Sequence, residues 1–367
     1  MIFILSLKLL SENGEVKARA HGEEIDDTFT REFEPGDRFR LETDGAKFVK
    51  LALAPTLAPS VVYLPDGVFE FEIPFDRERT ACYAPGTFDG DTHRVRVWEL
   101  SDAEIYGERM ISLNSHDRHN VAKYFPHAVA NFVTREDPCF FERNAIDGIT
   151  DNEGHGNYPF HSWGGGLRED LEYEVDFGAE VEVDRVTIYL RADFPHDTYW
   201  KEAELEFSDK SRIPLTLRGT KDGQTFEVPK KKTRTVKLTG FRQQRLEDGS
   251  LSFAALSQIE IYGNYIKEEK KGMEVRDASN AKDVKYYTTD RLREEFHIAN
   301  LFTKDNIRMV YSHTDRIIVI GMMPVKLELQ LEAGKELAAD YFLERRELGC
   351  INIGGKGVIV VDGETYE

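Results

Sequence analysis

The feature that most constrains the fold of this chain is the alternation of apolar and polar residues in short segments. Val68-Phe-Glu-Phe-Glu-Ile-Pro74 and Val95-Arg-Val-Trp-Glu-Leu100 alternate with a period of two, and turn signals such as Pro35-Gly36 stand between runs of this kind. Successive side chains of a β-strand point to opposite faces of the sheet, so the pattern predicts strands that are buried on one side. We therefore expect a mostly β protein.

Changes in this pattern divide the 367 residues into four segments. Residues 1–105 are expected to form a small β-sandwich, and residues 106–264 a second β-rich domain with a long Gly-rich loop. The charged residues 265–272 are expected to be a linker, and residues 273–367 a further β domain. That last domain is predicted to contain a helix capped by Asp290 or Thr289, followed by strands that include residues 325–331.

Charge and cysteine content exclude some classes of function. The net charge of −19 would repel a nucleic acid, although a local group of Arg or His can still bind an acidic sugar. No apolar run approaches the roughly 18–20 residues that span a bilayer. The apolar N-terminus lacks a basic region and a cleavage site, so we expect a first strand and no signal peptide. Three scattered cysteines favour a reducing compartment, and we expect a cytoplasmic protein without nucleic-acid or membrane partners.

Several short strings occur in order along the second domain. They are Asn144-Ala-Ile-Asp-Gly-Ile-Thr-Asp151, Trp163, Tyr173-Glu-Val-Asp-Phe-Gly178, Val186-Thr-Ile-Tyr189 and Ile259-Glu-Ile-Tyr-Gly263. Their order resembles the discoidin, or coagulation-factor C-type, jelly roll, which is similar to the galactose-binding β-sandwiches of carbohydrate-active proteins. The resemblance implies that Asp147, Thr150 and Glu260 hold a structural calcium ion, whose preferred ligands are oxygen atoms. A tight turn at Asp147-Gly148 is the alternative.

The long loop of this domain carries candidate sugar-binding residues. Tyr158 and Trp163 offer aromatic faces on which a sugar ring can stack, and His161 with Arg191 or Asp193 could bond hydroxyl groups or a carboxylate. A core-anchoring role for Trp163 is the alternative. Loops of this length within a compact domain are usually functional or mobile.

Three strings in the last segment are longer and rarer. They are Met309-Val-Tyr-Ser-His-Thr-Asp-Arg-Ile-Ile318, Met323-Pro-Val325 and Glu344-Arg-Arg-Glu-Leu-Gly-Cys-Ile-Asn-Ile-Gly-Gly355. Residues 273–367 thereby resemble the opening third of the 5-keto-4-deoxyuronate isomerases of pectin and uronate breakdown. The resemblance implies part of a cupin-type β-barrel, subunits that pack into homo-oligomers, and a ketol-isomerase that makes 2,5-diketo-3-deoxygluconate from its uronate substrate.

The same resemblance implies a zinc ion held by three His and one Glu, two of the His in an H-x-H-x4-E arrangement. The chain contains no such arrangement, and residues 273–367 hold only His297 and His313. We therefore expect no zinc site here and little isomerase activity. His313 and Arg316 are the candidate catalytic residues, through contact with the substrate carboxylate, and His313 as a structural residue at a strand end is the alternative. Arg345 and Arg346 could bind the same carboxylate or pair with Glu344 or Glu347.

Three interpretations of the whole chain remain open at this stage. It is an isomerase by descent, a non-catalytic carbohydrate-binding protein, or an in-frame join of two neighbouring genes at Met273. Asp362-Gly363 predicts a hairpin turn close to residue 367, and truncation within the last domain is the expectation that follows from it.

Overall fold

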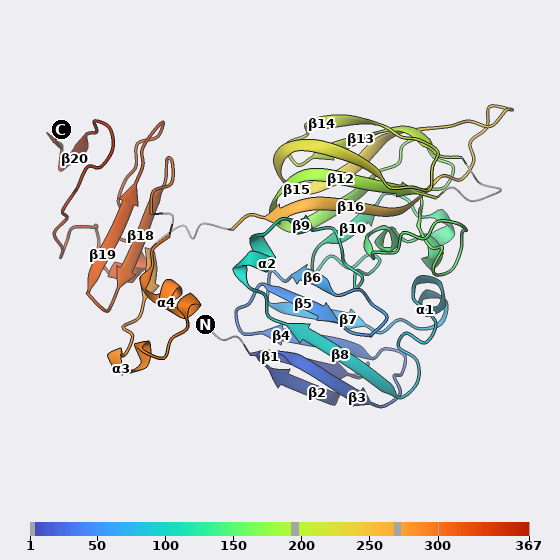
Figure 1. The fold of residues 1–367 in the computed structure, drawn as a ribbon, viewed down its shortest axis with the longest axis horizontal. Helices are drawn as coiled ribbons and strands as arrows, with labels where there is room; N and C mark the ends of the chain where they lie inside the picture. The colour runs from blue at the N-terminus through green and yellow to red at the C-terminus, as the bar shows by residue number, and fades with distance from the viewer. Residues whose placement is uncertain (1–3, 192–197, 268–272, 300, 367) are drawn as a thin grey trace. The chain divides into compact units, whose positions relative to one another are not determined.

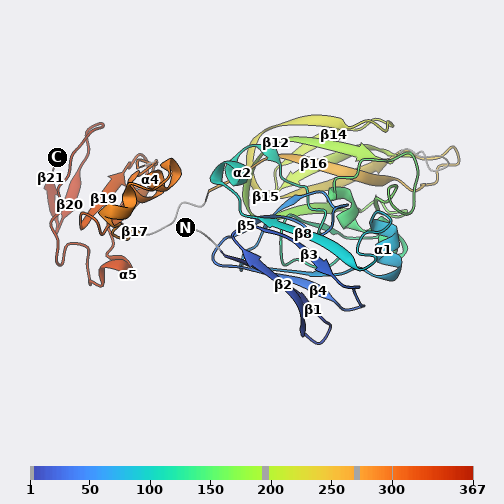
Figure 2. The same ribbon diagram turned by 60° about the horizontal axis from the view of Figure 1, so that its bottom comes forward.

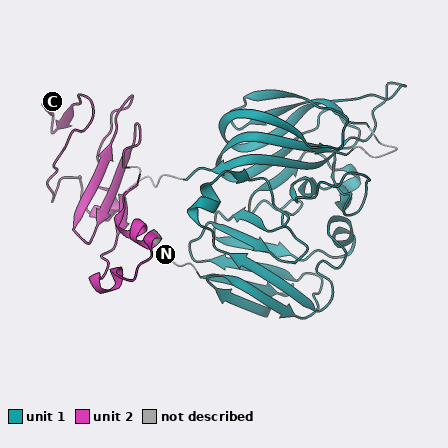
Figure 3. Cartoon of the chain, in the orientation of Figure 1, with its two compact units in different colours: residues 1–267 teal, residues 268–367 magenta. Residues whose placement is uncertain are grey.

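A computed structural model of the protein describes residues 4–191, 198–267, 273–299 and 301–366. The chain divides into two compact units, residues 1–267 and residues 268–367 (Figure 3). The boundary predicted at residue 105 does not separate compact units, because both predicted sandwiches lie in unit 1. The division falls within the linker predicted at 265–272, of which residues 268–272 lie outside the described residues. Strands dominate the regular structure, which confirms the prediction of a mostly β protein.

The first part of unit 1 is a sandwich of two antiparallel four-stranded sheets (Figures 1 and 2). One sheet has the order β2-β1-β4-β7 and the other the order β3-β8-β5-β6. The strands are β1 (Leu5–Leu10), β2 (Val16–Gly22), β3 (Ile25–Thr30), β4 (Arg38–Thr43), β5 (Phe48–Ala52), β6 (Ser60–Tyr63), β7 (Val68–Glu72) and β8 (Thr92–Trp98). Inward side chains such as Leu7, Phe39 and Phe71 are fully buried. Each such side chain contributes roughly 1.5–3 kcal/mol relative to exposure.

The second part of unit 1 contains eight strands. Their order is β11-β16-β12-β15-β13-β14, with β10 also paired to β12 and β9 to β16. They are β9 (Arg109–Met110), β10 (His127–Ala130), β11 (Trp163–Gly164), β12 (Tyr173–Leu190), β13 (Trp200–Phe207), β14 (Arg212–Thr216), β15 (Gln224–Gln243) and β16 (Ala255–Tyr265). Strand β12 combines two predicted strands, and its register with β15 shifts near Gly178. Gly178 has a φ of 70°, and a Cβ there would lie 2.3 Å from the ring of Phe125, so only glycine fits.

The two parts of unit 1 share their packing. Phe48 and Tyr63 of the first sandwich belong to the core of the second, whereas Tyr124 belongs to the core of the first. Tyr63 and Phe125 exchange two backbone hydrogen bonds of 2.8 and 3.0 Å. Short helices lie at the junction, α1 (Asp76–Cys82), α2 (Asp102–Tyr106) and the 3-10 helices η1 (Thr134–Glu136), η2 (Pro138–Phe140) and η3 (Glu142–Ile146). Unit 1 therefore consists of two β-sheet parts that contribute residues to each other's cores and form one compact unit.

Unit 2 is smaller and more open. Strand β17 (Met273–Arg276) pairs in parallel with β18 (Ile307–Ser312), which pairs antiparallel with β19 (Ile317–Met322). The remaining elements are α3 (Ala281–Val284), α4 (Thr289–Phe296), α5 (Gly334–Leu337), β20 (Ile359–Val361) and β21 (Glu364–Tyr366). Among the described residues, the hydrophobic cluster of unit 2 is built on buried Met273, Met309 and Phe342.

Two local predictions for unit 2 are wrong. The N-cap of α4 is Thr288, whose hydroxyl accepts a hydrogen bond from the backbone N–H of Arg291, rather than Asp290 or Thr289. Residues 325–331 alternate as a strand would, but they form none, since no described strand pairs with them.

The hairpin turn predicted at Asp362-Gly363 is confirmed between β20 and β21. No helix in the described part of the chain combines the length and apolarity that crossing a membrane requires.

Candidate functional sites

The structure places Trp163 in the core of unit 1. Its indole is fully buried on β11 and packs against Tyr173, Trp200 and Phe241, with ring centroids 5.0, 5.7 and 5.9 Å away. Its Nε1 donates a hydrogen bond of 3.0 Å to the carbonyl of Phe132. The prediction that Trp163 stacks on a sugar is therefore corrected, because neither face of the ring is accessible. The core-anchoring alternative is the one that the structure supports.

His161 and Asp147 form a buried pair beneath the same loop. The Nε2 of His161 lies 2.6 Å from Oδ2 of Asp147, and the Oδ1 of Asp147 accepts a hydrogen bond from the backbone N–H of Ile149. Arg143 lies 3.8 Å from the same carboxylate, and the ring of Tyr158, half-buried, lies 5.5 Å from that of His161. The Nδ1 of His161 has no hydrogen-bond partner among the described residues. These contacts brace the loop from inside.

Two of the three predicted calcium ligands have partners within the protein. Asp147 faces His161 and Arg143, a cation that competes for the carboxylate, whereas Glu260 accepts a hydrogen bond of 2.9 Å from the hydroxyl of Tyr262. Thr150 is exposed. The described ranges contain no group of three or more His, Cys, Asp or Glu that could hold a metal ion. A calcium ion bound by Asp147, Thr150 and Glu260 therefore stays a prediction, and it would have to compete with His161 and Arg143 for the carboxylate of Asp147.

The side chain of Arg191 is also buried. It is 3% exposed, and its Nη2 donates to the carbonyl of Phe253 at 3.1 Å. Its guanidinium therefore connects the end of β12 to the segment around Phe253 inside the fold. The neighbouring prediction for Asp193 lies outside the described residues. Of the four predicted sugar-binding residues, the structure brings the rings of Tyr158 and His161 together, buries Trp163 in the core and bonds Arg191 to the carbonyl of Phe253.

A histidine–glutamate pair that the sequence did not single out lies at the surface of unit 1. The Nδ1 of His119 is 2.8 Å from both carboxylate oxygens of Glu142, and its ring stacks on Phe141 at 3.9 Å. Burial by itself would lower the pKa of His119, but the hydrogen bond and charge of Glu142, with the charge of Glu136, raise it above its ordinary value. In contrast, burial lowers the pKa of the nearby His116 to about 3. The spacing of the two histidines gave no signal for this difference.

The candidates in unit 2 cluster around Tyr311. The ring of His313 stacks on Tyr311 with centroids 4.5 Å apart, and the guanidinium carbon of Arg346 lies 4.7 Å from the centroid of the Tyr311 ring. Arg316, the other predicted catalytic residue, is exposed in the β18–β19 turn with a φ of 56°. His313 thus has an aromatic neighbour in Tyr311, and Arg346 lies against the same ring.

The charges around this cluster are unevenly paired. Glu274 forms ion pairs with both Arg276, at 2.8 Å, and Arg308, at 2.5 Å. Arg345 pairs with Glu344 at 3.2 Å, which was one of the alternatives for this residue. Arg346 forms no ion pair with any residue that the structure describes. Its charge is therefore available to a ligand.

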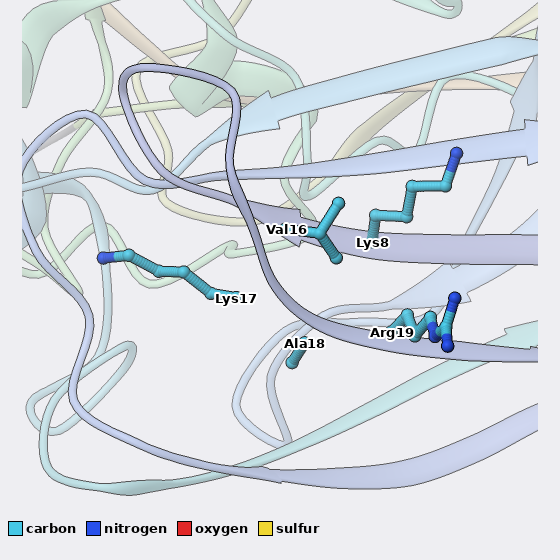
Figure 4. A pocket seen from close by; sticks show the side chains of 5 residues that line it. All are labelled: Lys8, Val16, Lys17, Ala18 and Arg19. Atoms are coloured by element: carbon cyan, nitrogen blue, oxygen red, sulfur yellow. The ribbon is translucent and has the colours of Figure 1, made fainter.

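An open hollow lies at the edge of the first sandwich and is lined by Lys8, Val16, Lys17, Ala18 and Arg19 (Figure 4). Lys8 pairs with Glu42 at 2.7 Å, and Lys17 pairs with Asp37 at the same distance. Two of its three cations are thus neutralised within the protein. We find no arrangement of groups in this hollow that favours a particular chemistry.

Comparisons with curated proteins locate the strongest likeness. No family model matches the chain. The 4-deoxy-L-threo-5-hexosulose-uronate ketol-isomerase of Lachnoclostridium phytofermentans is 62% identical over 95 residues, which are 26% of this chain and 34% of that protein. The proteins of the same name from Lachnospira eligens and Halalkalibacterium halodurans are 60% and 55% identical over 95 and 94 residues. The chain spans about a third of the length of these relatives. The predicted resemblance to uronate ketol-isomerases is confirmed.

Solved structures that are similar to part of this chain include carbohydrate-binding modules. The lectin domain of lectinolysin, complexed with Lewis B antigen, is 16% identical with a TM-score of 0.31 and covers 42% of this chain and 95% of its own. A fucose-binding module of Streptococcus pneumoniae, SpX-3, is 14% identical with a TM-score of 0.30 over 44% of this chain and 99% of its own. We draw nothing about function from likenesses of this strength.

Proposed function

We propose that this protein has a role in carbohydrate metabolism. In this proposal unit 2, which is related to isomerases, binds a uronate sugar and is joined to the β-sandwich unit 1. The observation that carries the proposal is the 62% identity over 95 residues to a uronate ketol-isomerase. Identity at this level over a continuous stretch supports a shared ancestor for that segment. The substrate of the relatives, 5-keto-4-deoxyuronate, is the ligand proposed for the unit.

The proposal separates binding from turnover. Moving a carbonyl along a sugar chain passes through an enediol-like intermediate, which needs a general acid and base and an electrophile for the developing oxyanion. The zinc ligands implied by the resemblance have no counterpart in the 367 residues, because no two histidines are spaced as H-x-H. We therefore expect this chain to bind the sugar without converting it.

The test uses the intact chain and an isomerase relative as the positive control. Purified protein is incubated with 5-keto-4-deoxyuronate, with and without added zinc, and the product is followed by NMR while binding is measured by calorimetry. We expect the relative to turn over the substrate and this chain only to bind it. Zinc-dependent turnover by this chain would show that it is a complete enzyme, and failure to bind would remove the proposed ligand.

A further inference from the structure

One group of side chains in unit 2 has the composition of a ligand site. Tyr311 lies on β18, and His313 follows the end of this strand in the turn that leads to β19. Their rings stack at 4.5 Å with 29° between the planes. The backbone N–H of His313 is fixed by a hydrogen bond of 2.9 Å to the carbonyl of Arg276. The imidazole is exposed, whereas its backbone is held by the sheet.

Arg346 completes the group from a distant part of the chain. Its guanidinium lies against the Tyr311 ring, 4.7 Å from the centroid, and the side chain is half-buried. A cation above an aromatic face is held by electrostatic attraction to the ring. The guanidinium of Arg346 makes no hydrogen bond or ion pair with the described residues. The position of Arg346 is thus fixed while its hydrogen-bonding capacity stays available.

Several other arginines of unit 2 are paired within the protein. Arg276 and Arg308 share the carboxylate of Glu274, and Arg345 pairs with Glu344. Arg346 has no ion pair among the described residues, which is also true of Arg293 and Arg316, but of these three only Arg346 lies against an aromatic ring in the described part of the chain. A planar guanidinium with two parallel donors matches a carboxylate in bidentate geometry, and the imidazole of His313 packs on the same Tyr311 ring as the guanidinium.

We propose that Tyr311, His313 and Arg346 form a binding site for the carboxylate group of a sugar acid. Arg346 receives the carboxylate, the exposed ring of His313 contacts the sugar ring or donates to a hydroxyl, and Tyr311 holds both side chains in place. The inference rests on the proposed function, because it names the residues through which unit 2 recognises a uronate. Tyr311 is a positioning residue here, and Arg346 is the residue that discriminates an acidic sugar from a neutral one.

The test titrates the intact chain with D-galacturonate, with galactose as the neutral counterpart and inorganic phosphate as a plain anion. We expect galacturonate to bind at least tenfold more tightly than galactose, and Arg346→Gln to remove about tenfold or more of that affinity, as expected for a hydrogen bond to a charged group. Arg346→Lys should retain part of it, because lysine keeps the charge but not the planar fork. The matched control is Arg345→Gln, whose guanidinium is already paired, and it should leave affinity unchanged.

Several outcomes would overturn the site. They are equal binding of galactose and galacturonate, equal binding of phosphate, or unchanged affinity in a folded Arg346→Gln variant, for which circular dichroism and the melting temperature report folding. The failures are distinguishable. If 5-keto-4-deoxyuronate binds but Arg346→Gln has no effect on it, the site is wrong and the proposed function stands. If galacturonate binds through Arg346 while 5-keto-4-deoxyuronate does not bind, the site stands and the proposed ligand is wrong.

Discussion

Arg143 shows how single residues organise the junction within unit 1. The side chain is 1% exposed, yet its donors reach the carbonyls of Asp117 and Ser115 at 2.9 and 3.0 Å and the side chain of Asn144 at 3.2 Å. A buried charge is tolerated when it is hydrogen-bonded throughout, and removing one partner would leave unsatisfied groups. The polar residues beneath the long loop therefore fix its conformation rather than offer a surface to a ligand.

The first prediction concerns Trp163. Replacement by alanine removes a fully buried indole and leaves a cavity, so the free energy of unfolding should fall by about 3–5 kcal/mol. Trp98→Ala is the matched control, since Trp98 is only half-buried on β8 and should cost less. Chemical denaturation of both variants measures the difference. A Trp163 variant of wild-type stability that lost galacturonate binding would restore the role in sugar binding.

The second prediction concerns pH. The pKa of His119 is raised in the folded protein, so its pairing with Glu142 stabilises the fold below the unfolded value of about 6.5 and is lost as pH rises through the higher folded pKa. His119→Gln should therefore destabilise the protein at pH 6 by roughly 0.5–1 kcal/mol and have little effect at pH 9. Thermal melting at both pH values tests this, with the exposed His21→Gln as control. Equal destabilisation at both pH values would contradict it.

At the scale of elements, most of the strands could be predicted from the sequence. Alternation located β7 and β8 in the first sandwich, because one face of each strand is buried and the apolar residues therefore recur with a period of two. Residues 325–331 have the same pattern without a described pairing strand, since a sheet depends on a partner that local pattern does not contain.

The candidate sites were less predictable for the same reason. The sequence of a Gly-rich loop does not show whether an aromatic residue in it faces solvent or, like Trp163, the core. The contact of Arg346 with Tyr311 joins residues 35 positions apart, and only the tertiary fold creates it. His313 was found because a family string drew attention to it, whereas His119 and Glu142 had no such string.

The third prediction concerns β20. Ile359, Val360 and Val361 are all exposed, and most exposed large hydrophobic side chains of the described residues lie in unit 2. An apolar strand without a covering partner is a template for association. We expect the chain to self-associate at high concentration, and Val358→Thr with Val360→Thr to reduce this. Light scattering measures it, with Val16→Thr on β2 of unit 1 as the control. Undiminished association in the double variant would show that another surface is responsible.

At the scale of the molecule, the two units differ in the core that stabilises them. Unit 1 contains two extensive clusters of buried side chains, whereas the core of unit 2 among the described residues consists of Met273, Met309 and Phe342. Buried apolar area is the main favourable contribution to folding, so the free energy of unfolding should be much larger for unit 1.

The fourth prediction follows from that difference. Calorimetry should show two transitions, with unit 2 unfolding at the lower temperature, and limited proteolysis should release a stable fragment close to residues 1–267. Cleavage is expected near Lys267, next to the boundary between the units. A single cooperative transition without preferential cleavage at this boundary would show that the two units fold as one.

The position of β16 in its sheet has a consequence for synthesis. It is the last strand of unit 1 in the sequence, yet it lies between β11 and β12 and also pairs with β9. A ribosome adds about 5–20 residues per second, so β16 follows β8 by roughly 10–30 s. During that interval the strands of the first sandwich can pair, while β12 still lacks its neighbour β16. The second sandwich closes only after residues 255–265 emerge, and until then its open edge is exposed to chaperones and to other nascent chains.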